Sequence, residues 1–122
     1  MSQNYKFEKF VNVRARLGEQ LVSIGESGYF SFNSAFFHHA KIDGFKWVNL
    51  FFDKDNAAIA FRFTNTEKED GVMTLIKRES GASITSRSFF ANHGIDTKIF
   101  AGRYSPKLVK DPQYGDLYVI NL

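Results

Sequence analysis

The sequence predicts a single β-rich α+β domain, and its length, its aromatic content and the spacing of its apolar runs lead to that prediction. A chain of 122 residues is long enough for one ordinary domain but short for two. Fourteen phenylalanines within a hydrophobic content of 43% exclude a disordered chain and favour strands. Short alternating runs separated by turn residues recur along the chain, with two helix signals among them. We therefore expect strands around a phenylalanine-rich core.

Residues 1–20 are predicted to form an N-terminal arm. Their apolar residues follow neither the period of a strand nor that of a helix throughout. The alternation at Val11 and Val13 favours an extended arm that ends in a short strand, and a helix over residues 5–17 is the alternative. Gly18 would end either element, because glycine interrupts both.

The first half of the domain, residues 21–63, begins with a predicted hairpin and a helix. Residues 21–24 and 29–32 are short apolar runs, and the Gly25-Glu26-Ser27-Gly28 segment between them has the length of a hairpin turn. Asn33-Ser34 is an N-cap signal for a two-turn helix over residues 35–40. Asp43-Gly44 ends this helical segment.

A second hairpin completes this half. The strand over residues 46–52 is apolar on both faces, which is typical of a central strand. Asp53-Lys54-Asp55-Asn56 is a turn by composition. The answering strand, residues 57–63, should direct Ile59, Phe61 and Phe63 inward and Arg62 outward.

Residues 64–71 are polar and form the predicted linker to the second half, residues 72–122. There we expect strands over 72–77 and 82–85, and then a helix over 87–93 with Ser86 at its N-cap and Gly94 at its end. A strand over 98–104, a loop containing Pro106, Pro112, Asp111 and Gly115, and a final strand over 117–122 follow. Each half thus has a strand-strand-helix-strand-strand order.

An internal repeat supports two pseudo-symmetric halves that form a small barrel or sandwich. At an offset of 53 residues, Phe36-Phe37 aligns with Phe89-Phe90, and Ile42-Asp43 aligns with Ile95-Asp96. At an offset of 52, Ser31-Phe32 aligns with Ser83-Ile84. One half of about 50 residues is too small to bury its own apolar face, so two halves should share a core.

The segments Tyr29–Phe37 and Asp43–Phe63 resemble the DNA-binding half-unit of the AbrB, MazE and MraZ (SpoVT-AbrB) superfamily. In that unit a strand, a polar cap, a two-turn helix and a hairpin follow one another. Residues 82–104 with 117–122 would be the second copy, so the arrangement is similar to MraZ, where two units share one chain. The family has Ile-Pro between strand and helix, whereas this chain has Phe32-Asn33 and Ile84-Thr85. The chain also looks similar to short, uncharacterised prokaryotic proteins. The resemblance implies DNA binding by a small prokaryotic regulator.

The charge distribution agrees with a polyanionic partner. The net charge is +3, with seven basic residues against four acidic ones in residues 71–122. Residues 1–22 carry four basic residues against two acidic ones, and the middle of the chain is net acidic. Basic clusters are the usual footprint of nucleic-acid binding. The candidate phosphate contacts to double-stranded DNA are Arg14, Arg16, Arg62, Lys77, Arg78, Arg87 and Arg103.

The residue pattern points away from catalysis and from bound cofactors. The chain has no Cys, no Gly-x-Ser-x-Gly motif and no phosphate-binding or dinucleotide-binding loop, so we expect no enzyme, no cofactor and no evident small-molecule substrate. His38 and His39 point about 100° apart on a helix, and no His-x₃-His spacing joins either of them to His93, so we expect no metal site.

Other features bear on partners and location. A run of apolar residues long enough to span a membrane and a secretory leader are both missing, which predicts a cytoplasmic protein with no membrane partner. The phenylalanines are predicted to form the core, and a base-stacking platform is the alternative. The two apolar faces around Trp47 and Phe51 indicate a possible subunit interface. The alternative function is therefore an oligomerising structural or protein-interaction module without nucleic-acid binding.

Overall fold

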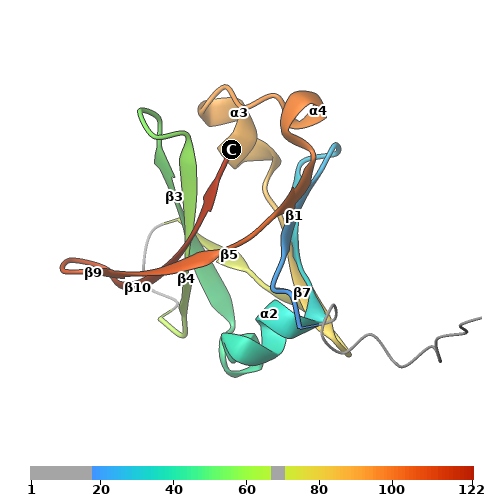
Figure 1. Cartoon of the computed structure of the whole chain (residues 1–122), viewed down its shortest axis with the longest axis vertical. Helices are drawn as coiled ribbons and strands as arrows, with labels where there is room; N and C mark the ends of the chain where they lie inside the picture. The colour runs from blue at the N-terminus through green and yellow to red at the C-terminus, as the bar shows by residue number, and fades with distance from the viewer. Residues whose placement is uncertain (1–17, 67–70) are drawn as a thin grey trace, which may run out of the picture.

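The structure, a computed structural model, describes residues 18–66 and 71–122, which form two five-stranded antiparallel sheets with short helices (Figure 1). Sheet A contains β1 (Val22–Gly25), β2 (Tyr29–Phe32), β6 (Ile76–Arg78), β7 (Gly81–Thr85) and β8 (Gly102–Tyr104). Sheet B contains β3 (Trp47–Asp53), β4 (Ala58–Thr64), β5 (Val72–Thr74), β9 (Lys107–Asp111) and β10 (Gly115–Asn121). The strand order is β6-β7-β2-β1-β8 in sheet A and β5-β3-β4-β10-β9 in sheet B. The predicted β-rich class is confirmed. Most of the predicted arm, including Arg14 and Arg16, lies outside the described residues, as do residues 67–70 of the linker.

The first half follows the sequence prediction closely. The hairpin β1–β2 leads into helix α2 (Ser34–His39), and the 3₁₀ turn η1 (Ile42–Gly44) precedes the hairpin β3–β4. Asn33 is the N-cap of α2, and its Oδ1 accepts the Phe36 N–H at 3.0 Å. The same oxygen accepts the Leu21 N–H at 3.0 Å, and the Asn33 Nδ2 donates to the Glu19 carbonyl at 2.7 Å. One side chain therefore begins the helix and also fixes the chain entering β1.

Substitution of the N-cap residue should cost more stability in helix α2 than in helix α3. Asn33→Ala should lower the free energy of unfolding by about 1–2 kcal/mol, because three hydrogen bonds are lost. Ser86, the N-cap of helix α3 (Arg87–Asn92), makes no cap hydrogen bond, and its fully buried hydroxyl donates only to the Met73 sulfur at 3.8 Å. Ser86→Ala should therefore cost less than about 0.5 kcal/mol. Urea titrations of the two variants measure the difference, and equal losses would contradict it.

Helix α3 ends where the sequence predicts. Gly94 has φ +64°, a conformation that favours glycine, and its N–H donates to the Ala91 carbonyl at 3.2 Å. The next N–H, of Ile95, donates to the Phe90 carbonyl at 2.9 Å. These two bonds form a Schellman motif, and the buried side chains of Ile95 and Phe90 accompany it.

The predicted single strand over residues 72–77 is wrong, because the chain bends there and serves both sheets. β5 pairs with β3 in sheet B, whereas β6 pairs with β7 in sheet A. Leu75 lies between them, is 7% exposed, and donates its N–H to the Lys46 carbonyl at 3.1 Å. Burial of Leu75 at the bend carries the chain from one sheet to the other.

Two further predictions in the second half are corrected. Residues 98–104 do not form one strand, because helix α4 (Thr97–Phe100) precedes strand β8. The Asp96 carboxylate accepts the Lys98 N–H at 2.9 Å and so caps the N-terminus of α4. The predicted loop after Pro106 contains strand β9. Pro106 and Pro112 flank this edge strand, so neither proline interrupts its hydrogen-bonded ladder. In the described part of the chain no helix is both long and apolar enough to cross a membrane.

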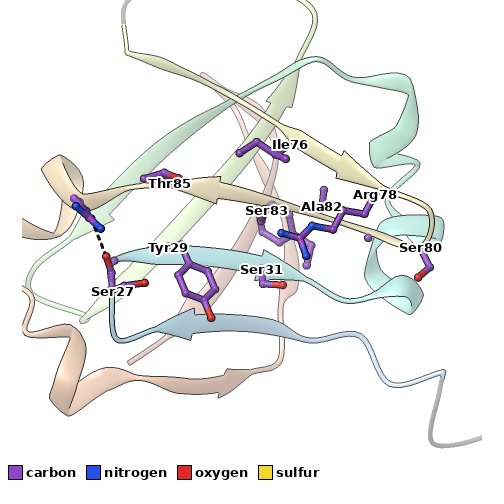
Figure 2. Close-up of a pocket in the computed structure, with 13 residues that line it drawn as sticks. Ser27, Tyr29, Ser31, Ile76, Arg78, Ser80, Ala82, Ser83 and Thr85 are labelled. Atoms are coloured by element: carbon purple, nitrogen blue, oxygen red, sulfur yellow. Dashed lines mark hydrogen bonds between the residues drawn. The ribbon is translucent and has the colours of Figure 1, made fainter.

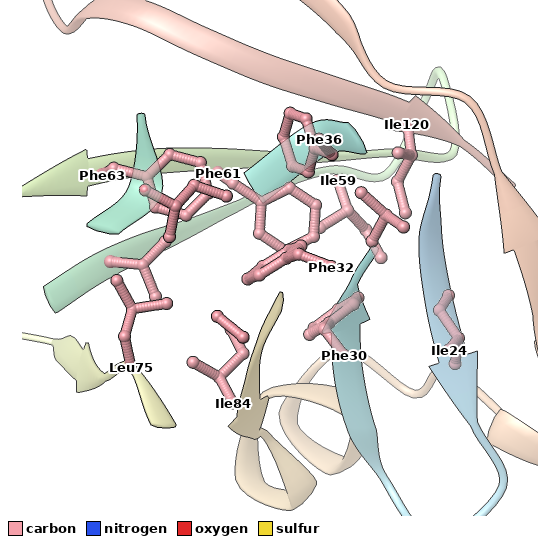
Figure 3. Packing of buried hydrophobic residues seen from close by; sticks show 14 of the residues in the cluster. Ile24, Phe30, Phe32, Phe36, Ile59, Phe61, Phe63, Leu75, Ile84 and Ile120 are labelled. Carbon is pink, nitrogen blue, oxygen red and sulfur yellow. The ribbon is translucent and has the colours of Figure 1, made fainter. Parts of the chain in front are cut away.

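The core lies between the two sheets and is built from aromatic contacts (Figure 3). Phe30 and Phe32 of β2 meet Phe61 of β4 edge-to-face, with ring centroids 4.9 and 5.3 Å apart. Phe32, Phe61 and Ile84 are buried, so Phe32 and Phe61 belong to the core, as predicted for the phenylalanines. Leu50 is only half-buried, since it packs on the margin of this core. Helix α2 lies at one end of the molecule and α3 and α4 lie at the other (Figure 1).

Candidate functional site

The outer face of sheet A carries a row of serines. Val22, Ile24, Phe30, Phe32, Ala82 and Ile84 are buried, so the residues that alternate with them face outward. The register places Ser23 opposite Ser31 and Ser31 opposite Ser83. Arg103 of β8 lies opposite Ser23 at one end of this row, and Ile76 of β6 lies opposite Ser83 at the other. Small hydroxyl side chains therefore occupy the middle of the face.

A surface hollow of about 540 Å³ lies over strands β6, β7 and β2 of this face (Figure 2). Its walls provide two arginines, six hydroxyls and three apolar side chains, and no carboxylate is among the described residues that line it. The polar lining residues are Ser27, Tyr29, Ser31, Arg78, Ser80, Ser83, Thr85 and Arg87. Cationic and hydroxyl donors without a carboxylate are suited to an anionic ligand.

Arg87 is fixed at one end of the hollow by the turn between β1 and β2. Its Nε donates to the Ser27 carbonyl at 3.1 Å, the contact drawn in Figure 2. Gly28 has φ +90°, and a Cβ there would lie 2.9 Å from the Arg87 Cγ. The Gly28 carbonyl also accepts the Ser86 N–H at 2.9 Å. The glycine thus allows the turn to lie against the start of α3, which brings Arg87 beside β2.

Arg78 approaches the hollow from the opposite side. It is the exposed last residue of β6, opposite Gly81, and it shares a face with Ser83 and Ile76. Figure 2 shows its side chain reaching from β6 across β7. The nearest acidic residue in sequence, Glu79, lies in the β6–β7 turn and does not line the hollow. The side chains of Arg78 and Arg87 therefore border the hollow from two different elements, β6 and α3.

Three of the predicted basic residues lie on the same side of sheet A. Arg78, Arg87 and Arg103 belong to the outer side of sheet A. Arg62 faces outward, as predicted, but from sheet B, because its neighbours Phe61 and Phe63 face the core.

Lys77 occupies a different position from these arginines. It is exposed at the edge of sheet A, opposite the buried Ala82. Its Nζ donates to the Asp43 carbonyl at 2.7 Å and so ties β6 to η1.

The histidines lie on two separate helices. His38 and His39 are in the last turn of α2, and His93 is the C-cap of α3. The His93 ring contacts the rings of Phe52 and Phe89, with centroids 4.9 Å apart in both cases. No group of three metal-binding side chains occurs in residues 18–66 and 71–122.

The hydroxyl residues of the hollow were not among the predicted contacts. The sequence pattern that could have identified them is the alternation in two strands, where Ser31 and Ser83 face outward and the phenylalanines and isoleucine point inward.

Comparison of the chain with family models, with curated proteins and with solved structures gave no match.

Proposed function

We propose that this protein is a small DNA-binding regulator that contacts the phosphate backbone of duplex DNA with the outer face of sheet A. The observation that carries the proposal is the position of three arginines on that side of the sheet: Arg78 and Arg87 line the hollow, and Arg103 lies at the opposite edge, across from Ser23. Arginine and hydroxyl side chains are among those that bind phosphate oxygens in protein–DNA complexes. They position the protein on the duplex without reading its sequence.

The extent of the face favours a polyanion over a single small anion. Arg103 and Arg78 belong to the two edge strands of sheet A, which are separated by four strand spacings. At about 4.8 Å each, these spacings amount to about 19 Å. That length matches about five to six base pairs of duplex, at about 3.4 Å each. One phosphate group could contact only one end of such a face.

The strand pairing supports the predicted duplication. Ser31 and Ser83, which the offset of 52 aligns, lie opposite one another in the central pair of sheet A. A two-fold axis through this pair would exchange β2 with β7 and β1 with β6. The order β3-β4-β10-β9 in sheet B has the same symmetry. Phe36-Phe37 and Phe89-Phe90 are the buried third and fourth residues of their helices. We propose on these grounds that the halves are repeats, as the resemblance to MraZ implies.

The same pairing favours a barrel over a sandwich, with one edge of β9 left open. The bent stretch β5–β6 joins the two sheets along one side, through β3 and β7. The stretch β8–β9 joins them along the other, since β8 pairs with β1 and β9 with β10. Each sheet edge thus continues into the other sheet.

A binding titration with mixed-sequence duplexes tests the proposed function. Fluorescence anisotropy should show binding at about 50 mM salt that weakens steeply at 200 mM, because each phosphate contact contributes about 0.9 to the log–log slope. A folded protein that binds no duplex at the lower salt concentration would overturn DNA binding and favour the protein-interaction module.

A further inference from the structure

Strand β9 has one edge that no other described strand pairs with. It ends the strand order of sheet B and pairs with β10 alone. Leu108 and Val109 are 47% and 44% exposed there, on opposite faces of the strand. In Figure 1 the β9–β10 hairpin projects away from the rest of the two sheets. An open edge with exposed aliphatic residues is a template for pairing with another chain.

The sequence of β9 is complementary to itself. The strand is Lys107-Leu108-Val109-Lys110-Asp111. Against an antiparallel second copy, with Val109 opposite Val109 of the second copy, Lys107 lies opposite Asp111 at both ends. Leu108 then lies opposite the aliphatic part of Lys110. Opposite charges and aliphatic pairs directly across a ladder stabilise it.

The charges select this register over its neighbours. A slip of one residue would turn every side chain of one copy to the other face of the sheet. A slip of two residues in one direction would place Lys110 opposite Lys110 of the second copy. The same slip in the other direction would place Lys110 opposite Pro106, which has no N–H to donate. Only the register centred on Val109 pairs all five residues without opposing like charges.

Lysines on an edge strand usually oppose such pairing, but both lysines of β9 have an acidic partner in this arrangement. The Lys110 Nζ lies 2.9 Å from the Asp116 Oδ1 on the neighbouring strand, and this carboxylate raises the pKa of Lys110. The Asp111 Oδ1 accepts the N–H groups of Gln113 and Tyr114 at 2.8 and 2.9 Å. These bonds hold the carboxylate at the end of β9, where Lys107 of the second copy would meet it.

We propose that two copies of this chain associate through antiparallel pairing of β9 with β9, which continues sheet B from one molecule into the other. The occupant of the edge is a second copy, since the complementarity lies in the strand's own sequence. The contact is separate from the outer face of sheet A and does not depend on the proposed DNA binding. Five residues a side form a small interface, so the dimer is concentration-dependent.

Sedimentation equilibrium of the full chain tests the contact. The wild-type mass should rise from 14.0 kDa towards twice that value as concentration increases. Val109→Lys places two ammonium groups at the centre of the ladder, so the mass should stay at the monomer value. Lys54→Glu, at an exposed position in the β3–β4 turn, is the control and should dimerise as the wild type does. A monomeric wild type, or a folded Val109→Lys variant that still dimerises, would overturn the proposal.

Disulfide trapping keeps the proposal testable if Val109→Lys fails to fold. The chain has no cysteine, so Val109→Cys introduces a single thiol. Directly opposed residues in an antiparallel pair have Cα atoms about 4.5–5.5 Å apart, within the range for a disulfide. Oxidised glutathione should convert Val109→Cys to a covalent dimer and leave Lys54→Cys monomeric. Equal cross-linking of the two variants, or none at Val109→Cys, would contradict pairing through β9.

Discussion

Replacing Phe61 by Ala should lower the free energy of unfolding by about 3–5 kcal/mol, the largest stability loss that we expect from one substitution. Phe61 is fully buried at the centre of β4, and its ring meets the rings of Phe30 and Phe32 from the other sheet. Its removal leaves a cavity between the sheets and deletes two edge-to-face aromatic pairs. Urea titration followed by circular dichroism measures the loss.

Ile99→Ala is the matched control for this prediction. Ile99 is 71% exposed on α4, so its truncation should cost less than about 0.5 kcal/mol. A loss below about 1 kcal/mol for Phe61→Ala would contradict a core shared by the two sheets.

The largest functional effect should follow from removing all three arginines of sheet A. The triple variant Arg78→Ala, Arg87→Ala and Arg103→Ala should lower the salt slope of duplex binding by about three, because about three phosphate contacts are lost. Its affinity should fall more than about tenfold for all sequences alike, since phosphate contacts carry no sequence information. Anisotropy titrations over a range of salt concentrations measure both quantities.

Two further variants make this result specific. Lys54→Ala removes one exposed charge away from sheet A and should leave the slope unchanged within error. Arg78→Ala with Arg103→Ala keeps the Arg87–Ser27 hydrogen bond and should lower the slope by about two. A folded triple variant with the wild-type slope would exclude these arginines from the contact.

Local sequence signals predicted the first half of the fold well. The Asn33 cap, the turn before Tyr29 and the alternation through Phe61 each depend on near neighbours in the chain. These features could therefore be predicted without knowledge of the rest of the molecule. The same applies to the end of α3, where Gly94 supplies the left-handed residue.

The wrong predictions in the second half of the chain have a common physical cause. Whether residues 72–77 continue or bend depends on the burial of Leu75 and on its bond to Lys46, which lies in the other half. Strand β9 forms because β10 pairs with it, although prolines flank it in the sequence. Both features are decided by tertiary pairing, which outweighs local propensity.

The candidate site was predicted in part for the same reason. The sequence identifies the arginines, but which of them share one face of a sheet depends on which strands become neighbours. Pairing of β2 with β7 brings the two serines together, and pairing of β1 with β8 adds Arg103 to the same face. No local pattern specifies either pairing.

Amide chemical-shift mapping with a mixed-sequence duplex tests most directly whether DNA binds the outer face of sheet A. On addition of duplex at low salt, we expect the largest shifts at Ser31, Ser83 and Arg103, and at Arg87 at the start of α3. The amides of Ala60 and Val119, in the central strands of sheet B, should shift little. Shifts concentrated on sheet B, or none anywhere on a folded protein, would overturn DNA binding at the outer face of sheet A.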